Sequence, residues 1–347
     1  MKDIYICHQY YDPSHFSALY DCAHKYGYNI KKYIVLSQRH IIGTFIKKLF
    51  KLRFREAFYW LLENEYNLYC LRFIKNKIMI VGLAPYDRLL NKFHSIFRNN
   101  KSIYFTSWQF WDGSSFPRGD ISNKGMYEEL LKSSFKSVAC VSKATEQSML
   151  SFFATTEVVN HSIYVKEYKN KTNYIRNHRY VFIGRFEHVK NIQLIIDTFK
   201  DFKEAQIDFI GFGSLEEIIQ HASHKYDNIH NLGKWTKEKI KGMLYGYDFL
   251  VLPSIEEPFG IVLLEALAAG IPCITSNALG PSEIIVDGVN GFISKVNINN
   301  EFSTMIKRAE NLSDDEYESL CQNALQTSLQ YSTEEVMKKW LNLLEKI

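Results

Sequence analysis

Short apolar runs alternate with longer helical patterns through the second half of the chain. The runs carry apolar residues at consecutive positions, which is typical of strands that are buried on both faces of a sheet. Strands that alternate with helices in this way predict a doubly wound parallel sheet. The expected strands cover residues 180–183, 207–210, 249–252 and 271–275, and the expected helices cover 191–199, 215–221, 260–269 and 281–286.

The first half shows the same alternation less regularly, with expected strands at 4–7, 32–36, 77–81, 102–105 and 138–141. The polar stretch 166–179 separates the halves and has the composition of a linker. We therefore expect an α/β protein of two Rossmann-like, doubly wound domains that face each other across a cleft. The first domain is expected at 1–165 and the second at 180–330, and a final helix at 331–347 is expected to cross back to the first domain.

Composition agrees with this organisation and excludes several classes of protein. The 347 residues are 46% hydrophobic and 23% charged, which excludes intrinsic disorder, and the chain is longer than one hydrophobic core usually supports. No apolar run approaches the roughly 18 residues of a membrane helix, and the N-terminus lacks the apolar stretch of a secretory signal. Six widely spaced cysteines are expected to be reduced thiols in a cytoplasmic protein.

Two cations follow the expected strand at 180–183, near the start of a helix. Arg185 and Lys190 lie in the run Gly-Arg-Phe-Glu-His-Val-Lys-Asn. Ligands of open parallel sheets bind beyond the carboxyl ends of the strands, and a helix N-terminus at that place favours anions. Arginine and lysine together can hold a diphosphate from two sides, although two solvated basic side chains would give the same pattern.

A turn with two glycines follows the next expected strand. Gly211 and Gly213 allow a tight turn, and Ser214 with Glu217 predicts a capping box at the start of the following helix. The turn is similar to the start of a dinucleotide-binding fingerprint, but Glu216 stands where the third glycine should be. A simple strand-to-helix turn and a nucleotide-binding turn both stay open at this point.

The strongest motif is an apolar helix that carries one acid. Between Gly260 and Gly270 every residue except Glu265 is apolar, so we expect the helix to be buried on all sides. A carboxylate in that position needs a partner, either sugar hydroxyl groups or a structural Arg or Lys. Glu257 lies eight residues earlier, just before the helix, where free backbone N–H groups can hold a phosphate or a sugar oxygen.

These three motifs, in this order, resemble the C-terminal domain of the GT-B glycosyltransferases, in particular the retaining family 4. The resemblance continues through residues 280–285 and 287–292, and residues 231–235 resemble the segment that frames the nucleotide base. It implies a GT-B fold and an enzyme that moves a sugar from a nucleotide-sugar donor with retention of configuration.

The resemblance also implies roles for individual residues. The catalytic group would be Arg185 and Lys190, which neutralise the leaving diphosphate, together with Glu257, which holds the transferred sugar. Glu265 would bind the ribose. The implied donor contacts are Arg185, Lys190, Gly211, Gly213, Lys234, Phe259, Gly260, Ile261, Val262 and Glu265.

The first half departs from the family at two places, and these give the expected acceptor contacts. His8 and His15 stand where many members have a glycine-rich loop after the first strand. Ser107 and Trp108 stand where many members have a histidine after a central strand. Because the sequence has no Asp-x-Asp motif, we expect no metal site, and no cofactor besides the nucleotide-sugar co-substrate.

Charge is distributed unevenly, with 24 Lys and Arg against 14 Asp and Glu in residues 1–170. Residues 39–55 hold six Lys and Arg and no acid, and 41–52 predict a helix with apolar residues on one side and lysines on the other. Such a helix can lie on an anionic membrane, or it can pack its apolar side on the sheet of the first domain. The resemblance implies a glycan or lipid-linked acceptor, in the synthesis of bacterial surface polysaccharide at the inner face of the cytoplasmic membrane.

Two other functions stay open, a nucleotide-sugar epimerase of the same fold and a non-catalytic nucleotide-sugar-binding protein. An epimerase would consume the donor without an acceptor. The joint presence of the two cations and two acids named above argues against a non-catalytic protein. A nicotinamide oxidoreductase would need the complete glycine fingerprint. We expect no nucleic-acid partner, because residues 39–60 are too amphipathic to form a stacking platform.

Overall fold

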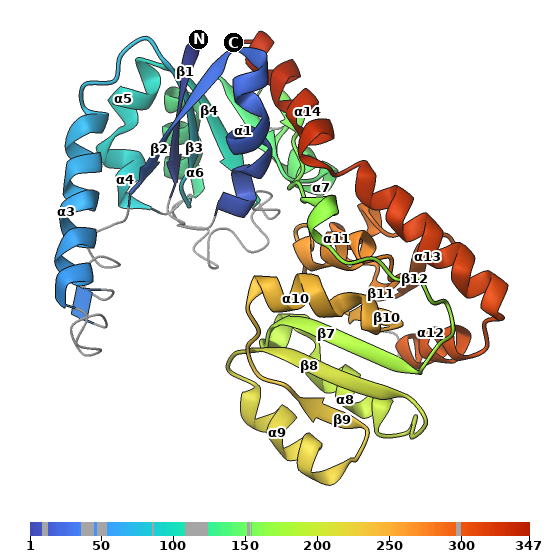
Figure 1. Cartoon of the computed structure of the whole chain (residues 1–347). Coiled ribbons are helices and arrows are strands. Elements are labelled where there is room, and N and C mark those ends of the chain that lie inside the picture. The colour runs from blue at the N-terminus through green and yellow to red at the C-terminus, as the bar shows by residue number, and fades with distance from the viewer. Residues whose placement is uncertain are drawn as a thin grey trace. The chain divides into compact units, whose positions relative to one another are not determined.

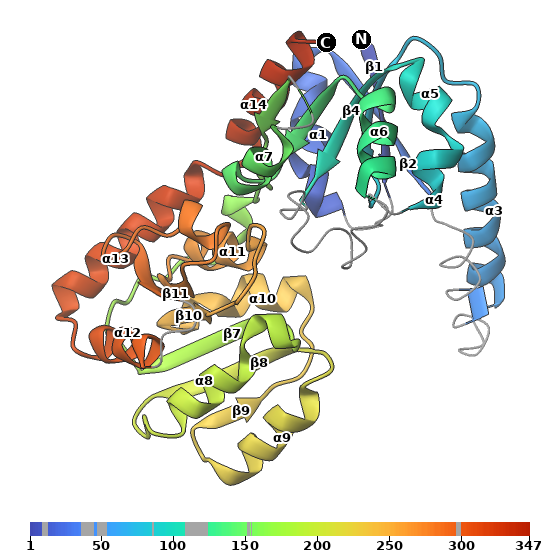
Figure 2. The same cartoon turned by 180° about the vertical axis from the view of Figure 1, so that it is seen from behind.

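The computed structural model divides into two compact units. Unit 1 is Met1–His161 together with Val336–Ile347, and unit 2 is Ser162–Glu335. Each unit has a parallel sheet with helices on both of its faces (Figures 1 and 2). The structure describes residues 1–8, 13–35, 45–46, 54–84, 87–107, 124–150, 153, 155–295 and 300–347. The expectation of two Rossmann-like α/β domains of the GT-B fold class is confirmed, whereas the expected domain boundaries stay predictions.

The sheet of unit 1 has six parallel strands in the order β2-β1-β3-β4-β5-β6. All five strands expected in this half overlap an observed strand, and the short outer strand β6 was not expected. The central strands are buried because their residues are apolar at consecutive positions, as a sheet covered on both faces requires. The strands are β1 (Lys2–His8), β2 (Tyr28–Ile34), β3 (Ile78–Gly82), β4 (Lys101–Thr106), β5 (Ser137–Cys140) and β6 (Thr156–Val158).

The helices of unit 1 lie against this sheet, and one of them comes from the far end of the chain. The chain returns with α14 (Thr333–Glu345), whose Trp340 is buried against the rings of Phe16 and Phe105 at centroid distances of 6.3 and 6.0 Å. The expected return of the last helix to the first domain is therefore confirmed. The other helices are α1 (Ser17–Cys22), α3 (Phe54–Leu71), α4 (Arg88–Lys92), α5 (His94–Arg98), α6 (Lys124–Ser134) and α7 (Lys143–Met149).

The sheet of unit 2 also has six parallel strands, in the order β12-β11-β10-β7-β8-β9. Sequence patterning found the four central strands but missed the two at the edges, which are short and less apolar. The strands are β7 (Arg179–Arg185), β8 (Gln206–Phe212), β9 (Ile229–Asn231), β10 (Phe249–Leu252), β11 (Cys273–Ser276) and β12 (Gly291–Ser294).

The helices of unit 2 follow the strands in turn. The helix expected at 281–286 is only a 3-10 turn at Pro281–Glu283, and this prediction is wrong because the following residues leave the turn to form the next loop. The helices are α8 (Ile192–Phe199), α9 (Glu216–Lys225), α10 (Lys237–Met243), α11 (Ile261–Ala268), α12 (Glu301–Glu310) and α13 (Asp314–Leu329).

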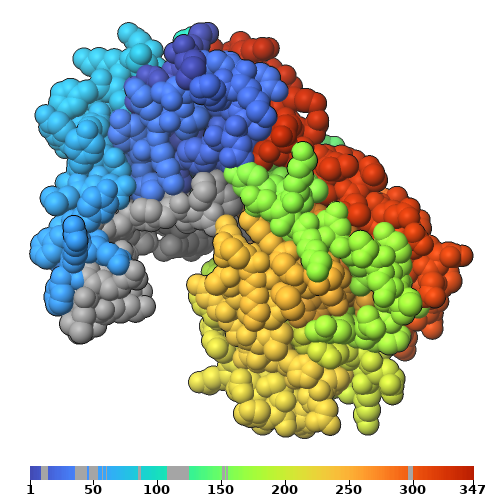
Figure 3. All heavy atoms as spheres, viewed as in Figure 1, coloured from blue at the N-terminus to red at the C-terminus, as the bar shows by residue number. Residues whose placement is uncertain are grey.

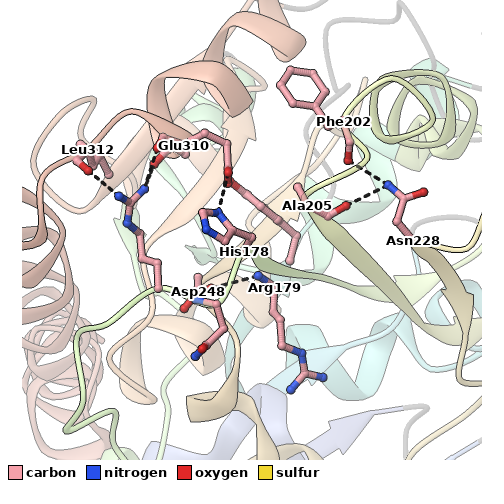
Figure 4. A network of polar contacts seen from close by, with 12 residues as sticks. His178, Arg179, Phe202, Ala205, Asn228, Asp248, Glu310 and Leu312 are labelled. Carbon is pink, nitrogen blue, oxygen red and sulfur yellow. Dashed lines mark hydrogen bonds and ion pairs between the residues drawn. The ribbon is translucent and has the colours of Figure 1, made fainter.

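The polar segment 166–179 is part of unit 2, where charged side chains hold it in place. Lys171 is 5% exposed and its ammonium group lies 2.9 Å from the carboxylate of Asp248. The same carboxylate accepts hydrogen bonds from the backbone N–H groups of Asn177 and Arg179, at 2.8 and 2.9 Å. His178, one residue away, lies 2.6 Å from the carboxylate of Glu310 (Figure 4). These contacts fix the entry of the chain into β7, the strand that carries the first cationic motif.

Candidate functional site

Three neighbouring strands of unit 2 end at one edge of its sheet, and each carries one of the sequence motifs. Strands β10, β7 and β8 are adjacent and parallel, so their carboxyl ends meet at that edge. Arg185 is the last residue of β7, and Gly211 is the last but one of β8. The loop after β10 leads through Glu257 to Gly260, which caps the start of α11.

Lys190 and Glu257 form an ion pair across two of these loops. The ammonium group of Lys190 donates a hydrogen bond to the carboxylate of Glu257, and the two side chains are only 15% and 12% exposed. Backbone hydrogen bonds hold both loops next to the pair. The N–H of Ile255 donates to the carbonyl of Val189 at 2.8 Å, and the N–H of Gly280 donates to the carbonyl of Glu257 at 3.1 Å. Two predicted site residues that are distant in sequence are thus brought together.

Arg185 is exposed at the end of β7, beside a polar contact between the first two motifs. The hydroxyl group of Ser214 donates to the carboxylate of Glu187 at 2.7 Å, and this hydrogen bond lowers the pKa of Glu187. The predicted capping box of Ser214 and Glu217 is wrong. The cap position of α9 is Leu215, whose apolar side chain cannot accept a hydrogen bond, and the hydroxyl group of Ser214 binds Glu187 instead.

Gly211 and Gly213 let the loops after β7 and β8 approach closely. Gly211 has a φ of +154°, and a Cβ atom there would lie 1.8 Å from the carbonyl oxygen of Gly184. A Cβ atom on Gly213 would lie 2.5 Å from the carbonyl oxygen of Phe186. Close packing of the two loops thus requires both glycines, and their expected contact with a donor stays a prediction.

Helix α11 is open to solvent on one side only. Its buried residues are Leu263, Leu264, Ala266, Leu267 and Ala268. Ile261, Val262 and Glu265 are partly exposed, and at 100° per residue they fall within one arc of about 100°. The expectation that this helix is buried on all sides is therefore wrong for the three residues that were expected to bind the donor.

The start of α11 is set by its two preceding residues. Gly260 has a φ of +91°, a conformation that favours glycine, and it turns the chain into the helix. The Phe259 side chain is 2% exposed, and its ring lies 5.9 Å from the ring of Tyr331. Phe259 can therefore offer a ligand only its backbone, together with the N–H groups of Ile261 and Val262 in the first turn.

Tyr168 supplies a partner for Glu265 that sequence reasoning missed. Its hydroxyl group donates to the Oε1 atom of Glu265 at 3.2 Å, and the tyrosine is 7% exposed. Burial, and then the nearby carboxylate, raise the pKa of Tyr168, so the hydroxyl group stays protonated and keeps donating. The residue lies in the polar segment 166–179, where composition indicated a linker and gave no signal of a structural role.

Lys234 follows β9, at the edge of the same sheet. Its ammonium group lies 4.9 Å from the centre of the Phe212 ring, in a cation–π contact between two exposed side chains. Phe212 is the last residue of β8, so Lys234 lies beside the glycine turn. Its expected role in donor binding stays a prediction.

The expected acceptor residues lie in unit 1. His8 ends β1 and is fully buried, and burial, with smaller contributions from Lys32 and His15, lowers its pKa to about 4. His15 is half-buried, and its ring lies 4.7 Å from that of His161. Ser107 is exposed directly after β4, and Trp108 lies outside the described residues. His8 and His15 are thus neighbours, and His8 is neutral near pH 7.

The described part of the chain contains neither a metal-binding cluster nor a membrane-spanning helix. Among these residues no group of three or more His, Cys, Asp and Glu side chains is arranged to hold a metal ion. No helix among them is both long and apolar enough to cross a membrane.

The segment of unit 2 that carries these motifs is similar to a known family of glycosyltransferases. Residues 166–327 match the family model described as "Glycosyl transferases group 1", and this segment includes every motif placed above in unit 2.

Solved structures of the same fold can be superposed on this chain over its whole length. Sucrose-phosphate synthase from Thermosynechococcus elongatus has a TM-score of 0.72 at 13% identity, and the match covers 100% of this chain and 99% of that one. HepE from Anabaena, in complex with UDP and glucose, has a TM-score of 0.68 at 14% identity, with 100% of both chains covered.

Curated relatives are similar over part of the chain. An uncharacterized glycosyltransferase of Methanocaldococcus jannaschii is 30% identical over 128 residues, which is 36% of either chain. The N-acetyl-alpha-D-glucosaminyl L-malate synthase of Bacillus anthracis is 30% identical over 123 residues, 33% of this chain and 32% of that one. The chain thus spans about a third of the length of these two relatives.

Proposed function

We propose that the protein is a retaining glycosyltransferase that moves a sugar from a nucleotide-sugar donor to a glycan or lipid-linked acceptor in the synthesis of bacterial surface polysaccharide. The observation that carries the proposal is the ion pair of Lys190 and Glu257 at the sheet edge that Arg185 also occupies. This pair lies inside the segment that matches the glycosyltransferase family model.

The two cations suit a reaction in which negative charge develops on a diphosphate. In the proposed transfer the acceptor oxygen bonds to the anomeric carbon, the bond from that carbon to the diphosphate oxygen breaks, and the departing phosphate takes the acceptor proton. Arg185 and Lys190 stabilise the charge that grows on the phosphate, and fixed charges of this kind are usually the largest contribution to catalysis. Because Glu257 already orients Lys190, the lysine needs little rearrangement when a phosphate arrives.

Glu265 and the first turn of α11 suit the rest of the donor. The open side of the helix presents Glu265, whose carboxylate can accept hydrogen bonds from both ribose hydroxyl groups while Tyr168 holds it. The backbone N–H groups of Ile261 and Val262 lie at a helix N-terminus, where they favour phosphate or sugar oxygens.

The acceptor side of the proposal rests on charge. Residues 39–55 hold six Lys and Arg without an acid, which suits the anionic headgroups that surround a lipid-linked acceptor at the inner face of the membrane. Of this segment the structure describes residues 45, 46, 54 and 55, so the expected helix at 41–52 lies largely outside the described residues.

Two assays on the whole protein test the proposal. The protein is first unfolded by heat in the presence of each of a panel of nucleoside diphosphates. The midpoint temperature of unfolding should rise with one of them, because a ligand that binds only the folded state stabilises it. The matching nucleotide-sugars are then supplied with and without lipid-linked and soluble glycan acceptors. Acceptor-dependent release of the diphosphate with an α-linked product from an α-linked donor supports the proposal. Consumption of the donor without an acceptor would instead indicate an epimerase, and binding without turnover would indicate a non-catalytic protein.

A further inference from the structure

The outward side of α3 is apolar, which is unusual for a helix at the surface of a globular unit. At 100° per residue, six exposed large side chains of this helix fall within one arc of about 140°. Phe73, two residues after the helix, continues the row, because its ring lies 5.0 Å from that of Tyr69. We call this surface the α3 apolar face; each member is between 53% and 70% exposed, and the members are Phe54, Phe58, Tyr59, Leu62, Tyr66, Tyr69 and Phe73.

The packing of the opposite side of α3 fixes this orientation. Leu68 and Leu71 are buried in the apolar core of unit 1, at 6% and 0% exposure. Asn67 is also buried, and its side-chain amide donates to the backbone carbonyl of Ile34 at 3.0 Å. Since α3 is anchored through these residues, its apolar face points away from the core. In Figures 1 and 2 the start of α3 extends beyond the strands of its own unit, and in Figure 3 α3 is seen at the left edge of unit 1.

Exposed aromatic side chains are concentrated on the α3 apolar face. Of the eight exposed Phe and Tyr side chains in the described part of the chain, six belong to it. The face also extends toward the preceding basic segment, because the ring of Phe45 lies 5.3 Å from that of Phe58 and Ile46 is 43% exposed. Contiguous exposed apolar surface of this kind marks an interaction site.

Charge decides between the partners that such a surface could take. Arg55 and Glu65 are both exposed on the same side of α3 as the aromatic residues, whereas Glu56 and Glu63 lie away from the centre of that side by about 100° or more. The segment 39–55 that leads into the helix adds further cations and no acid. The cations of residues 39–55 outnumber the acids of α3, so the face and the segment that leads into it together carry net positive charge. An anionic lipid surface has the complementary charge.

We propose that the α3 apolar face docks on the interface of an anionic lipid bilayer. Aromatic side chains insert at the boundary between headgroups and acyl chains, where tyrosine keeps its hydroxyl group in water, and the neighbouring Arg and Lys side chains bind the headgroups. This docking would hold the enzyme where a lipid-linked acceptor is found, and its role therefore rests on the proposed function.

Vesicle sedimentation with the whole protein tests this docking. The test variant combines Phe58→Gln, Leu62→Gln and Tyr66→Gln, which removes the centre of the face without changing any charge. The matched control combines three exposed apolar residues of unit 1 that lie outside α3, as Tyr26→Gln, Met126→Gln and Leu150→Gln. Parent and control should sediment with vesicles that contain phosphatidylglycerol and much less with pure phosphatidylcholine. The test variant should lose about tenfold or more of this binding, because insertion of apolar side chains provides it.

Three outcomes would refute the docking proposal. Equal vesicle binding by the test variant and the parent would show that the face is not the docking surface, and no binding by the parent would show that the protein does not dock on this lipid. A parent that is dimeric in solution and becomes monomeric in the test variant would assign the face to a second copy. Thermal shifts with nucleoside diphosphate, which should be equal in all three proteins, report on the proposed function separately. Failed donor binding with intact vesicle binding would refute only the glycosyltransferase proposal.

Discussion

Replacing Glu265 by alanine should weaken the binding of nucleoside diphosphate while the fold survives. The carboxylate lies on the one open side of α11 and accepts the hydroxyl group of Tyr168 at 3.2 Å. Removing a charged hydrogen-bond acceptor costs about 1.5–3 kcal/mol, which corresponds to a loss of affinity of about 10- to 150-fold. Because the side chain is partly exposed and its neighbours on the helix stay buried, little core packing is lost.

Isothermal titration calorimetry with the parent, Glu265→Ala and Glu265→Gln measures this loss. The ribose contact predicts that the parent discriminates between a nucleoside diphosphate and its 2′-deoxy analogue, and that Glu265→Ala does so much less. Tyr168→Phe keeps the carboxylate but removes its support, so it should lose only about fivefold in affinity, as expected for one ordinary hydrogen bond. If Glu265→Ala binds both nucleotides as tightly as the parent, the ribose role of this residue is wrong.

Three further predictions concern pH, metal and membrane. Because the pKa of His8 falls from 6.5 to about 4 on folding, the unfolded chain binds a proton that the folded chain refuses. The free energy of unfolding should therefore decrease as the pH drops from about 6.5 toward 4, by on the order of 3 kcal/mol. Denaturant titrations of His8→Phe should show a smaller decrease, and a decrease equal to that of the parent would contradict its assignment to His8. Sugar transfer should persist in excess EDTA, and a complete loss that magnesium or manganese restores would refute the expectation of a metal-free reaction. Changing Lys47, Lys48 and Lys51 to Glu should abolish vesicle binding, since each cation contributes about 1 kcal/mol at an anionic surface. Activity on a soluble acceptor should be nearly unchanged. If the variant still binds vesicles, this segment does not contact the membrane.

The sheets could be predicted from the sequence because their central strands are apolar at consecutive positions. Strands such as Phe249–Leu252 are buried along their whole length, so composition alone marks them. The edge strand Ile229–Asn231 carries one fully buried residue and gave no such signal. The return of the last helix to unit 1 was expected, but its anchoring through Trp340 is a long-range contact that no local pattern reveals.

The candidate site was predictable where short motifs sit at strand ends, and unpredictable where side chains from distant segments meet. Arg185 and Lys190 stood out as two cations that follow an apolar strand, and Glu257 stood out because Pro258 and Gly260 mark the turn into an apolar helix. The contact of Tyr168 with Glu265 joins residues 97 positions apart, and nothing near the tyrosine in sequence indicates it. The open side of α11 was also missed, because helical periodicity cannot show which side a neighbouring loop leaves uncovered.

Steady-state kinetics of Arg185→Ala and Lys190→Ala, with Lys203→Ala as an exposed lysine control from the same unit, show whether the two cations stabilise the departing diphosphate. Each of the two variants should lower kcat by about 100-fold or more while the KM for the donor changes little, because charge on the diphosphate grows as its bond to the sugar breaks. The control should match the parent. An effect confined to KM, with kcat unchanged, would mean that the two cations bind the donor without stabilising the departing diphosphate, and the proposed catalytic role would be wrong.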